Sequence, residues 1–168
     1  MPNSLKRLMR DYQIIKQTNT IEDNYEIGPI DDDNLYEWQL KLFNFEDDQI
    51  LSKGMKEFNI DKLILNIKFS DNYPISPPFV YIVNPKLDSG FIFDGAICME
   101  LLTQEGWGAA TSISTLVMSI RAMLIHTNAK VIESSHSYTY DNAKKGFEYL
   151  EKYHKENGWT NHRMFRDS

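Results

Sequence analysis

Residues 73–79 read YPISPPF and stand between two stretches with the pattern of β-strands. Apolar residues occupy every second position from Leu63 to Phe69, and Phe79 to Val83 is a short apolar run. Proline lacks a backbone N–H and fixes φ, so this segment cannot continue a sheet ladder. We expect a rigid turn between two strands. It could be a plain connector or a docking surface that loses little entropy on binding.

The first residues predict an amphipathic helix. Apolar side chains recur at helical spacing between Leu5 and Ile15, and Asn3 or Ser4 is the expected N-cap. The remaining face carries three cations, which we interpret as a solvated surface: Lys6, Arg7 and Arg10.

Two further strands are expected before the turn. Residues 38–42 alternate between apolar and polar, and 25–27 form a weaker candidate that Gly28-Pro29 is expected to end. Residues 44–61 are longer than a tight hairpin needs and predict a polar surface insertion.

After the strands, residues 84–110 show no sustained period and are rich in glycine. A loop of this length in a compact domain is more often functional than idle. The single cysteine of the chain, Cys98, lies in its middle.

Two helices are expected to close the chain. Ser112 can cap the first, whose apolar stripe runs from Ile113 to Leu124, and the second covers 140–157. Strands and helices are segregated along the sequence, which predicts an α+β fold with an antiparallel sheet. A length of 168 residues fits one domain, residues 1–168.

Composition excludes several classes of protein. A net charge of −6 argues against a nucleic-acid binder. One cysteine makes no internal disulfide and no Cys₄ or Cys₂His₂ zinc site, which favours a reducing compartment, the cytoplasm or the nucleus. No apolar stretch reaches the ~18 residues of a membrane helix, so we expect a soluble protein that does not bind membranes.

Cys98 is open to two interpretations on its chemistry. A thiolate is a strong nucleophile and also a good leaving group, which suits a carrier of acyl groups. Cysteines that carry no chemistry are among the most buried residues, so an inert core cysteine is the alternative. Its place in a glycine-rich loop, and not on an apolar stripe, favours the carrier.

Taken together, the motifs resemble the ubiquitin-conjugating enzyme family. They are YPISPP at 73–78, GAIC at 95–98, MELL at 99–102 and Trp107. The wording CMELLTQEGW, and HKENGW at 154–159, is most similar to the Q-type subfamily. The resemblance covers about residues 4–159. It implies an N-terminal helix, a four-stranded antiparallel sheet, a long active-site loop and C-terminal helices.

The resemblance also implies an activity. Cys98 would accept the C-terminal glycine of ubiquitin from a ubiquitin-activating enzyme as a thioester, then pass it to an amine or to a ligase cysteine. The implied partners are ubiquitin, the activating enzyme and ubiquitin ligases, with the chain itself a monomer. No cofactor is expected, because ATP is used by the activating enzyme and this sequence has no P-loop.

One family motif is missing. Most members carry His-Pro-Asn shortly before the cysteine, and its asparagine steadies the loop or the oxyanion. The nearest counterpart here is Asn84-Pro85-Lys86, with Lys86 in place of asparagine. The Q-type subfamily also lacks the motif, so its absence does not imply a dead enzyme. Backbone amides of the turn at Gly95 are candidate oxyanion donors.

Three further residues are candidates at the site. His154 has the pKa class of a general base but shares an apolar helix stripe, so a core histidine is the alternative. Trp159 could fold back beside His154 or anchor the C-terminus. Phe91 could pack over the cysteine or only bury its own loop.

The resemblance assigns partner-binding residues as well. Lys6 and Arg10 would meet the activating enzyme. The first helix, together with the turn and the loop after Trp107, would form a ligase-facing surface that includes Ile75, Pro77, Ala109 and Ala110.

Three rival functions remain open. The chain could be a catalytically inactive binding module of the same fold, although such relatives generally lack the cysteine. It could carry a ubiquitin-like protein. A cysteine hydrolase would need a histidine base and an orienting Asp or Asn, for which the sequence offers no recognisable motif beyond His154.

Overall fold

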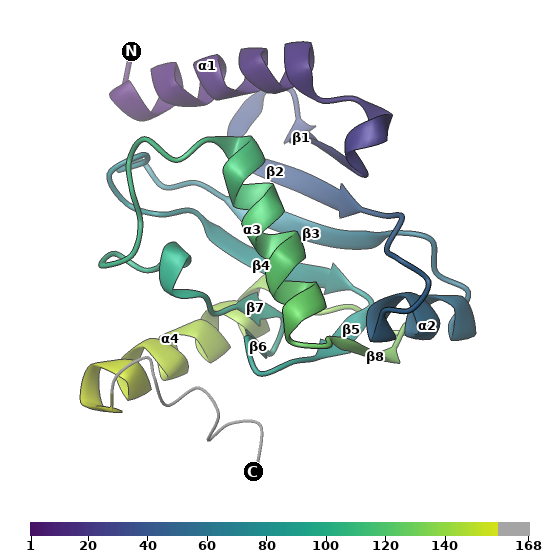
Figure 1. Cartoon of the computed structure of the whole chain (residues 1–168). Coiled ribbons are helices and arrows are strands. Elements are labelled where there is room, and N and C mark those ends of the chain that lie inside the picture. The colour runs from purple at the N-terminus through teal and green to yellow at the C-terminus, as the bar shows by residue number, and fades with distance from the viewer. Residues whose placement is uncertain (158–168) are drawn as a thin grey trace.

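The computed structural model describes residues 1–157 (Figure 1). Its elements, in chain order, are α1 (Asn3–Thr18), the 3₁₀ turn η1 (Ile21–Asp23), β1 (Tyr25–Asp31), β2 (Asn34–Leu42), α2 (Ile50–Glu57), β3 (Leu63–Lys68), β4 (Phe79–Asn84), β5 (Lys86–Asp88), β6 (Ile92–Phe93), β7 (Ala96–Ile97), the 3₁₀ turn η2 (Glu100–Leu102), α3 (Ile113–His126), β8 (Lys130–Glu133) and α4 (Tyr140–Asn157).

The predicted α+β fold with a four-stranded antiparallel sheet is confirmed. Strands β1 to β4 pair in sequence order, with Trp38 opposite Ile67 and Leu65 opposite Ile82. The two-residue strands β7 and β6 extend this sheet beyond β4, and β5 pairs separately with β8. The chain therefore turns back to the sheet edge just before Cys98.

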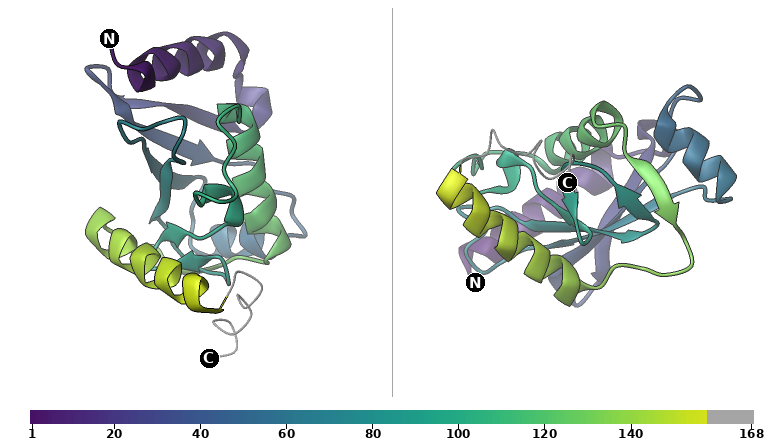
Figure 2. Two further views of the ribbon diagram at one scale, coloured as in Figure 1. Left: turned by 90° about the vertical axis from the view of Figure 1, so that its left-hand side faces the viewer. Right: turned by 90° about the horizontal axis from the view of Figure 1, so that it is seen from below.

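Strand alternation divides the buried side chains into two layers. Leu65 and Ile82 belong to the main core with α1 and α3, whereas Tyr81 faces a second, smaller cluster with α4. The left view of Figure 2 shows α3 and α4 on different sides of the strands. Thus α4 packs on the face of the sheet that the main core leaves open, at the end formed by β4, β7 and β6.

Both closing helices lie where the sequence predicts them. The Ser112 side chain accepts a hydrogen bond from the Thr115 amide (3.1 Å), which confirms it as the N-cap of α3. Helix α4 has the predicted bounds. At α1 the predicted cap is wrong, because the N-cap is Pro2 and the Ser4 hydroxyl is instead 2.8 Å from the Tyr36 hydroxyl.

The prediction that β1 ends at Gly28-Pro29 is also wrong. The strand continues to Asp31, and Pro29 lies opposite Trp38. Because β1 is the outer strand of the sheet, a residue without an N–H can be accommodated there.

The insertion at 44–61 is more than a polar surface loop. It contains α2, whose Leu51 and Met55 are buried in the main core. Their spacing of four residues places them on one face of the helix. A Cβ on Gly54 would lie 3.1 Å from Val131, so the absence of a side chain there lets α2 approach β8 closely.

The long glycine-rich stretch is ordered by short strands and by the turn at Gly95. Gly95 has a φ of +92°, and its carbonyl accepts a 2.7 Å hydrogen bond from the Ile82 amide. A Cβ at this position would lie 2.7 Å from Tyr138 Cγ, so only glycine fits. Within residues 1–157, no helix is both long enough and apolar enough to cross a membrane.

Candidate active site

Cys98 directly follows β7 and is held by its backbone. Its amide donates a 2.8 Å hydrogen bond to the carbonyl of Phe91, which ties it to the start of the β6–β7 hairpin. Ile97 belongs to the main core, whereas its neighbours Ala96 and Cys98 belong to the second cluster. Alternation thus directs the thiol to the face of the sheet that α4 covers.

Helix α4 closes over this part of the sheet. Ala143 and Leu150 are buried in the same cluster as Cys98. Between them, a Cβ on Gly146 would lie 2.8 Å from the carbonyl oxygen of Phe93, so the helix backbone runs close against β6. The result is a thiol with 0% of its surface exposed.

The buried environment changes the ionisation of this thiol. Burial raises the pKa of Cys98, because a thiolate would lose its hydration there. The sulfur also lies 3.8 Å from the Ala96 carbonyl, which suits the neutral S–H as a weak donor. In this arrangement Cys98 is a protected thiol and not an ionised nucleophile.

Phe91 contacts the cysteine through its backbone. Its side chain is half-buried against the main core, on the other side of the sheet from α4. The structure therefore gives this aromatic ring a packing role in its own loop. The carbonyl bond to Cys98 is the feature that sequence reasoning missed.

His154 lies on the buried face of α4, one helical turn beyond Leu150, and is 5% exposed. It lines a hollow of about 560 Å³ between the segment after η2 and the end of α4. The lining side chains are Thr103, Gln104, Glu105, Glu151, His154 and Lys155. Trp159 lies outside the described residues.

The Asn84-Pro85-Lys86 segment is bonded to the linker before α4. The Asn84 amide donates to the carbonyl of Ser134 (3.1 Å). Lys86 Nζ is 3.8 Å from a Glu133 carboxylate oxygen and 5.4 Å from the centre of the Tyr138 ring. These residues therefore organise the approach to α4.

The predicted partner-binding residues gather around the turn at 73–78. Trp107 Nε1 donates to the carbonyl of Pro74 (2.7 Å), and Gln104 donates to that of Ile75 (3.3 Å). The Ile75 side chain is 66% exposed, and Ala109 is also exposed. The remaining members are Lys6, Arg10 and Ala110, which are exposed, and Pro77, which is half-buried.

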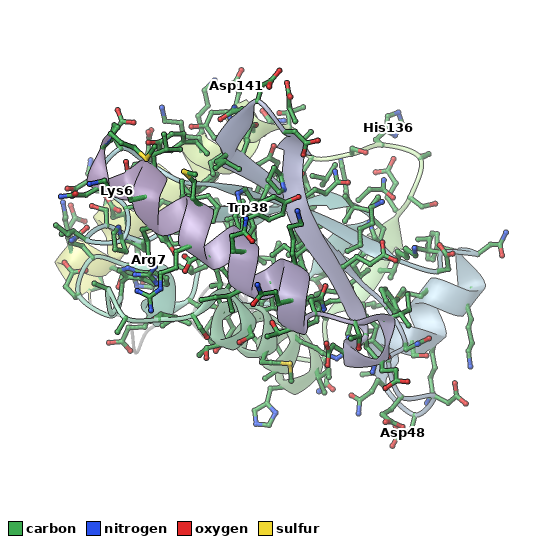
Figure 3. All side chains as sticks on the ribbon, turned by 90° about the horizontal axis from the view of Figure 1, so that it is seen from above. Lys6, Arg7, Trp38, Asp48, His136 and Asp141 are labelled. Atoms are coloured by element: carbon green, nitrogen blue, oxygen red, sulfur yellow. The ribbon has the colours of Figure 1, made fainter. Side chains whose placement is uncertain are left out.

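Arg7 corrects the prediction of a solvated basic face on α1. Its guanidinium pairs with Asp11 (2.9 Å) and donates to the carbonyls of Ala109 and Thr111, the latter at 2.8 Å. Figure 3 shows Lys6 and Arg7 projecting from different sides of α1. Lys6 is exposed, whereas Arg7 fastens the loop after Trp107 to the helix.

Sequence reasoning missed the buried carboxylate that completes this arrangement. Asp11 lies on the buried face of α1 with Leu8 and Ile15, and it is 6% exposed. A charged residue on an apolar stripe, four residues from an arginine, is the signal that could have revealed the pair.

No group of three His, Cys, Asp or Glu side chains within residues 1–157 is arranged to hold a metal ion. The chemistry that the described site can supply therefore comes from one thiol, one histidine and hydrogen-bonding groups of the backbone.

Comparison with known proteins agrees with the architecture. A sequence model described as ubiquitin-conjugating enzyme matches residues 7–154. The human protein named ubiquitin-conjugating enzyme Q-like protein 1 is 36% identical over 134 residues, which cover 77% of this chain and 83% of that protein. Human ubiquitin-conjugating enzyme E2 Q1 is 35% identical over 161 residues, 91% of this chain and 38% of that longer protein.

Among solved structures, human ubiquitin-conjugating enzyme E2 G1 superposes with a TM-score of 0.62 at 20% identity, covering 74% of this chain and 96% of that chain. At this identity the likeness shows the fold alone. The family match and the relatives above carry the assignment further. The chain belongs to the ubiquitin-conjugating enzyme family and is of the Q type.

Proposed function

We propose that this chain carries ubiquitin as a thioester on Cys98 and transfers it to a substrate amine or to a ligase. The observation that carries the proposal is the position of the only cysteine. It directly follows β7, in the GAIC segment, in a chain whose family match spans residues 7–154.

The loading step balances without a cofactor. The Cys98 thiolate attacks the carbonyl carbon of the thioester between ubiquitin and the activating enzyme. A new C–S bond forms to Cys98, the old C–S bond breaks, and the cysteine of the activating enzyme leaves as a thiolate. No group is oxidised or reduced, and the proton lost by Cys98 is balanced by protonation of the leaving sulfur.

Discharge is the reverse kind of exchange. An amine nitrogen of the acceptor attacks the same carbonyl carbon, a C–N bond forms, and Cys98 leaves as a thiolate. The amine must lose a proton, and His154 is our candidate acceptor for it, because it lines the hollow at the end of the helix that covers Cys98.

We further propose that the exposed surface around Ile75 and Ala109 receives ubiquitin ligases, and that Lys6 and Arg10 on α1 contact the activating enzyme. The support is that Arg7 and Trp107 bond this loop to α1 and to the 73–78 turn, which makes one pre-formed surface.

A charging reaction tests the thioester. The purified chain is incubated with ubiquitin, activating enzyme and ATP, and separated on a non-reducing gel. The proposal expects a band heavier by one ubiquitin that disappears with thiol reductant and is absent in Cys98→Ala.

The complete burial of Cys98 favours a second candidate, a binding module that keeps the fold without the chemistry. Alkylation of the native protein separates the two. A thiol that reacts only when the whole chain unfolds, in a protein that also fails to charge, supports the binding module.

A further inference from the structure

The segment between β8 and α4 is fastened to the end of β4 by one side chain. The Asn84 amide donates to the Ser134 carbonyl (3.1 Å), the His136 carbonyl (3.4 Å) and the Ser137 hydroxyl (3.3 Å). The Tyr138 amide adds a 2.9 Å bond to the Val83 carbonyl. Apart from half-buried Ser134, the Asn84 acceptors belong to exposed residues, and His136 is visible on this outer linker in Figure 3.

The same linker reaches the turn that carries the cysteine segment. Tyr138 packs against Gly95, where only a missing side chain leaves room for its ring. Its hydroxyl donates to the Leu87 carbonyl (3.2 Å). Two residues later α4 begins, so the position of the linker sets the position of the first turns of α4 over β7.

The grip of α4 itself on the sheet is limited. Its buried residues are one on each turn, Ala143, Gly146, Leu150 and His154, and two of them are too small to bury much apolar area. The Phe147 and Tyr140 rings add edge contacts to Phe79, and Lys68 Nζ lies 3.6 Å from the centre of the Tyr140 ring. A helix held in this way depends on the anchoring of its first turn.

We propose that Asn84 is a positioning residue: it clasps the 134–137 linker, holds α4 closed over Cys98, and must release before the thiol can accept an acyl group. The inference rests on the proposed function in its last clause only. The closed state is the one that the structure shows, with Cys98 fully buried. Opening is required because a nucleophile must reach within about 3–3.5 Å of the carbonyl carbon, which a covered sulfur cannot do.

The asparagine can be replaced in two informative ways. Asn84→Ala removes the donor. Asn84→Asp keeps the shape but replaces the donor by a carboxylate that faces two carbonyl oxygens, so it repels the linker. Both variants are expected to open α4 more often, the aspartate at least as much as the alanine.

Alkylation of Cys98 measures the opening directly, since the chain has one cysteine and any thiol label reports on it. With iodoacetamide at neutral pH, we expect Asn84→Ala to react about tenfold faster than the wild type, the size of effect that two weakened hydrogen bonds allow. Asn19→Ala is the matched control. It also loses an amide bond to a backbone carbonyl, that of Tyr25 (3.2 Å), but at the far end of α1.

A denaturant titration of each variant separates local opening from global unfolding. The proposal expects faster alkylation of the Asn84 variants under conditions where their unfolded fraction is too small to explain it. If Asn84→Ala does not fold, Ser137→Ala removes one acceptor and is expected to give a smaller increase. Alkylation rates equal to wild type and Asn19→Ala would overturn the clasp.

Charging is then measured on the same variants. Faster alkylation with faster charging of Asn84→Asp supports both parts of the proposal, and faster alkylation with unchanged charging overturns the requirement for release. A wild type that cannot be charged at all contradicts the proposed function, while the alkylation result still decides whether Asn84 holds α4 closed.

Discussion

The Tyr73 hydroxyl donates a 2.7 Å hydrogen bond to Oδ2 of Asp11 and so joins the 73–78 turn to the first helix through the protein interior. The same carboxylate pairs with Arg7, whose guanidinium lies 5.4 Å from the centre of the Tyr73 ring. Arg7 in turn bonds to the loop after Trp107. One buried carboxylate thereby fixes the three segments that we assign to partner binding.

Removing the hydroxyl is expected to destabilise the whole fold. Burial, reinforced by the bond to Asp11, raises the pKa of Tyr73, so its hydroxyl stays a donor at neutral pH. Tyr73→Phe loses a bond to a charged group, which typically contributes about 1.5–3 kcal/mol. We expect the free energy of unfolding to fall by about 2 kcal/mol in a urea titration.

Tyr149→Phe provides the comparison, because that side chain is 57% exposed on α4. It should unfold within about 0.5 kcal/mol of the wild type. Equal stabilities of the two phenylalanine variants would show that the bond between Tyr73 and Asp11 contributes nothing to folding.

The raised pKa of Cys98 predicts a stability that depends on pH. The folded chain binds the thiol proton more tightly than the unfolded chain, in which the pKa is about 8.5. This contribution is therefore complete below about pH 8.5 and is lost as the pH rises above it, by about 1.4 kcal/mol per pH unit.

The measurement is the difference in unfolding free energy between the wild type and Cys98→Ala from pH 6 to 10. The difference should be constant up to about pH 8 and then shift against the wild type, since only that chain has a thiol to ionise. A difference that stays level to pH 10 would mean that the folded thiol ionises like an exposed one.

Lys86→Asn restores the usual family residue and is expected to leave the rate of thioester formation within about twofold of the wild type. The contacts of Lys86 are to Glu133 and to the Tyr138 ring, and the ion pair is partly exposed, so it contributes at most about 1 kcal/mol. Single-turnover charging is the readout. A large loss of rate would assign Lys86 a direct part in the reaction.

For His154→Ala we expect slower discharge to an amine acceptor with loading less affected, because a base is needed when the amine loses its proton. Pulse-chase discharge of the charged chain to free lysine, across pH 6 to 9, measures this. A variant that discharges normally and only melts at lower temperature would show His154 to be a core residue.

The order and class of the elements could be predicted because periodicity and proline punctuation report on them directly. The alternation at Trp38 and Leu65 specifies strands whose partners the structure confirms. What could not be predicted depends on tertiary contacts. Pro29 is accommodated because β1 is an edge strand, and α2 is too short for its two apolar residues to stand out.

The candidate site divides in the same way. Cys98 could be found from its loop and motif, whereas its burial depends on α4, which is distant in sequence and contacts β7. The role of Asn84 was hidden for a similar reason. Its partners lie about fifty residues further along, in a linker without any periodic pattern.

The most direct test of the central claim is to charge the wild type, Cys98→Ala and Cys98→Ser with ubiquitin, activating enzyme and ATP, and to measure intact masses with and without thiol reductant. We expect the wild type to gain one ubiquitin less one water, and to lose it with reductant. Cys98→Ala should gain nothing, and any adduct on Cys98→Ser should resist reductant as an oxygen ester. A reductant-sensitive adduct on Cys98→Ala, or no adduct on folded wild type beside an active control enzyme, would contradict a ubiquitin thioester on Cys98.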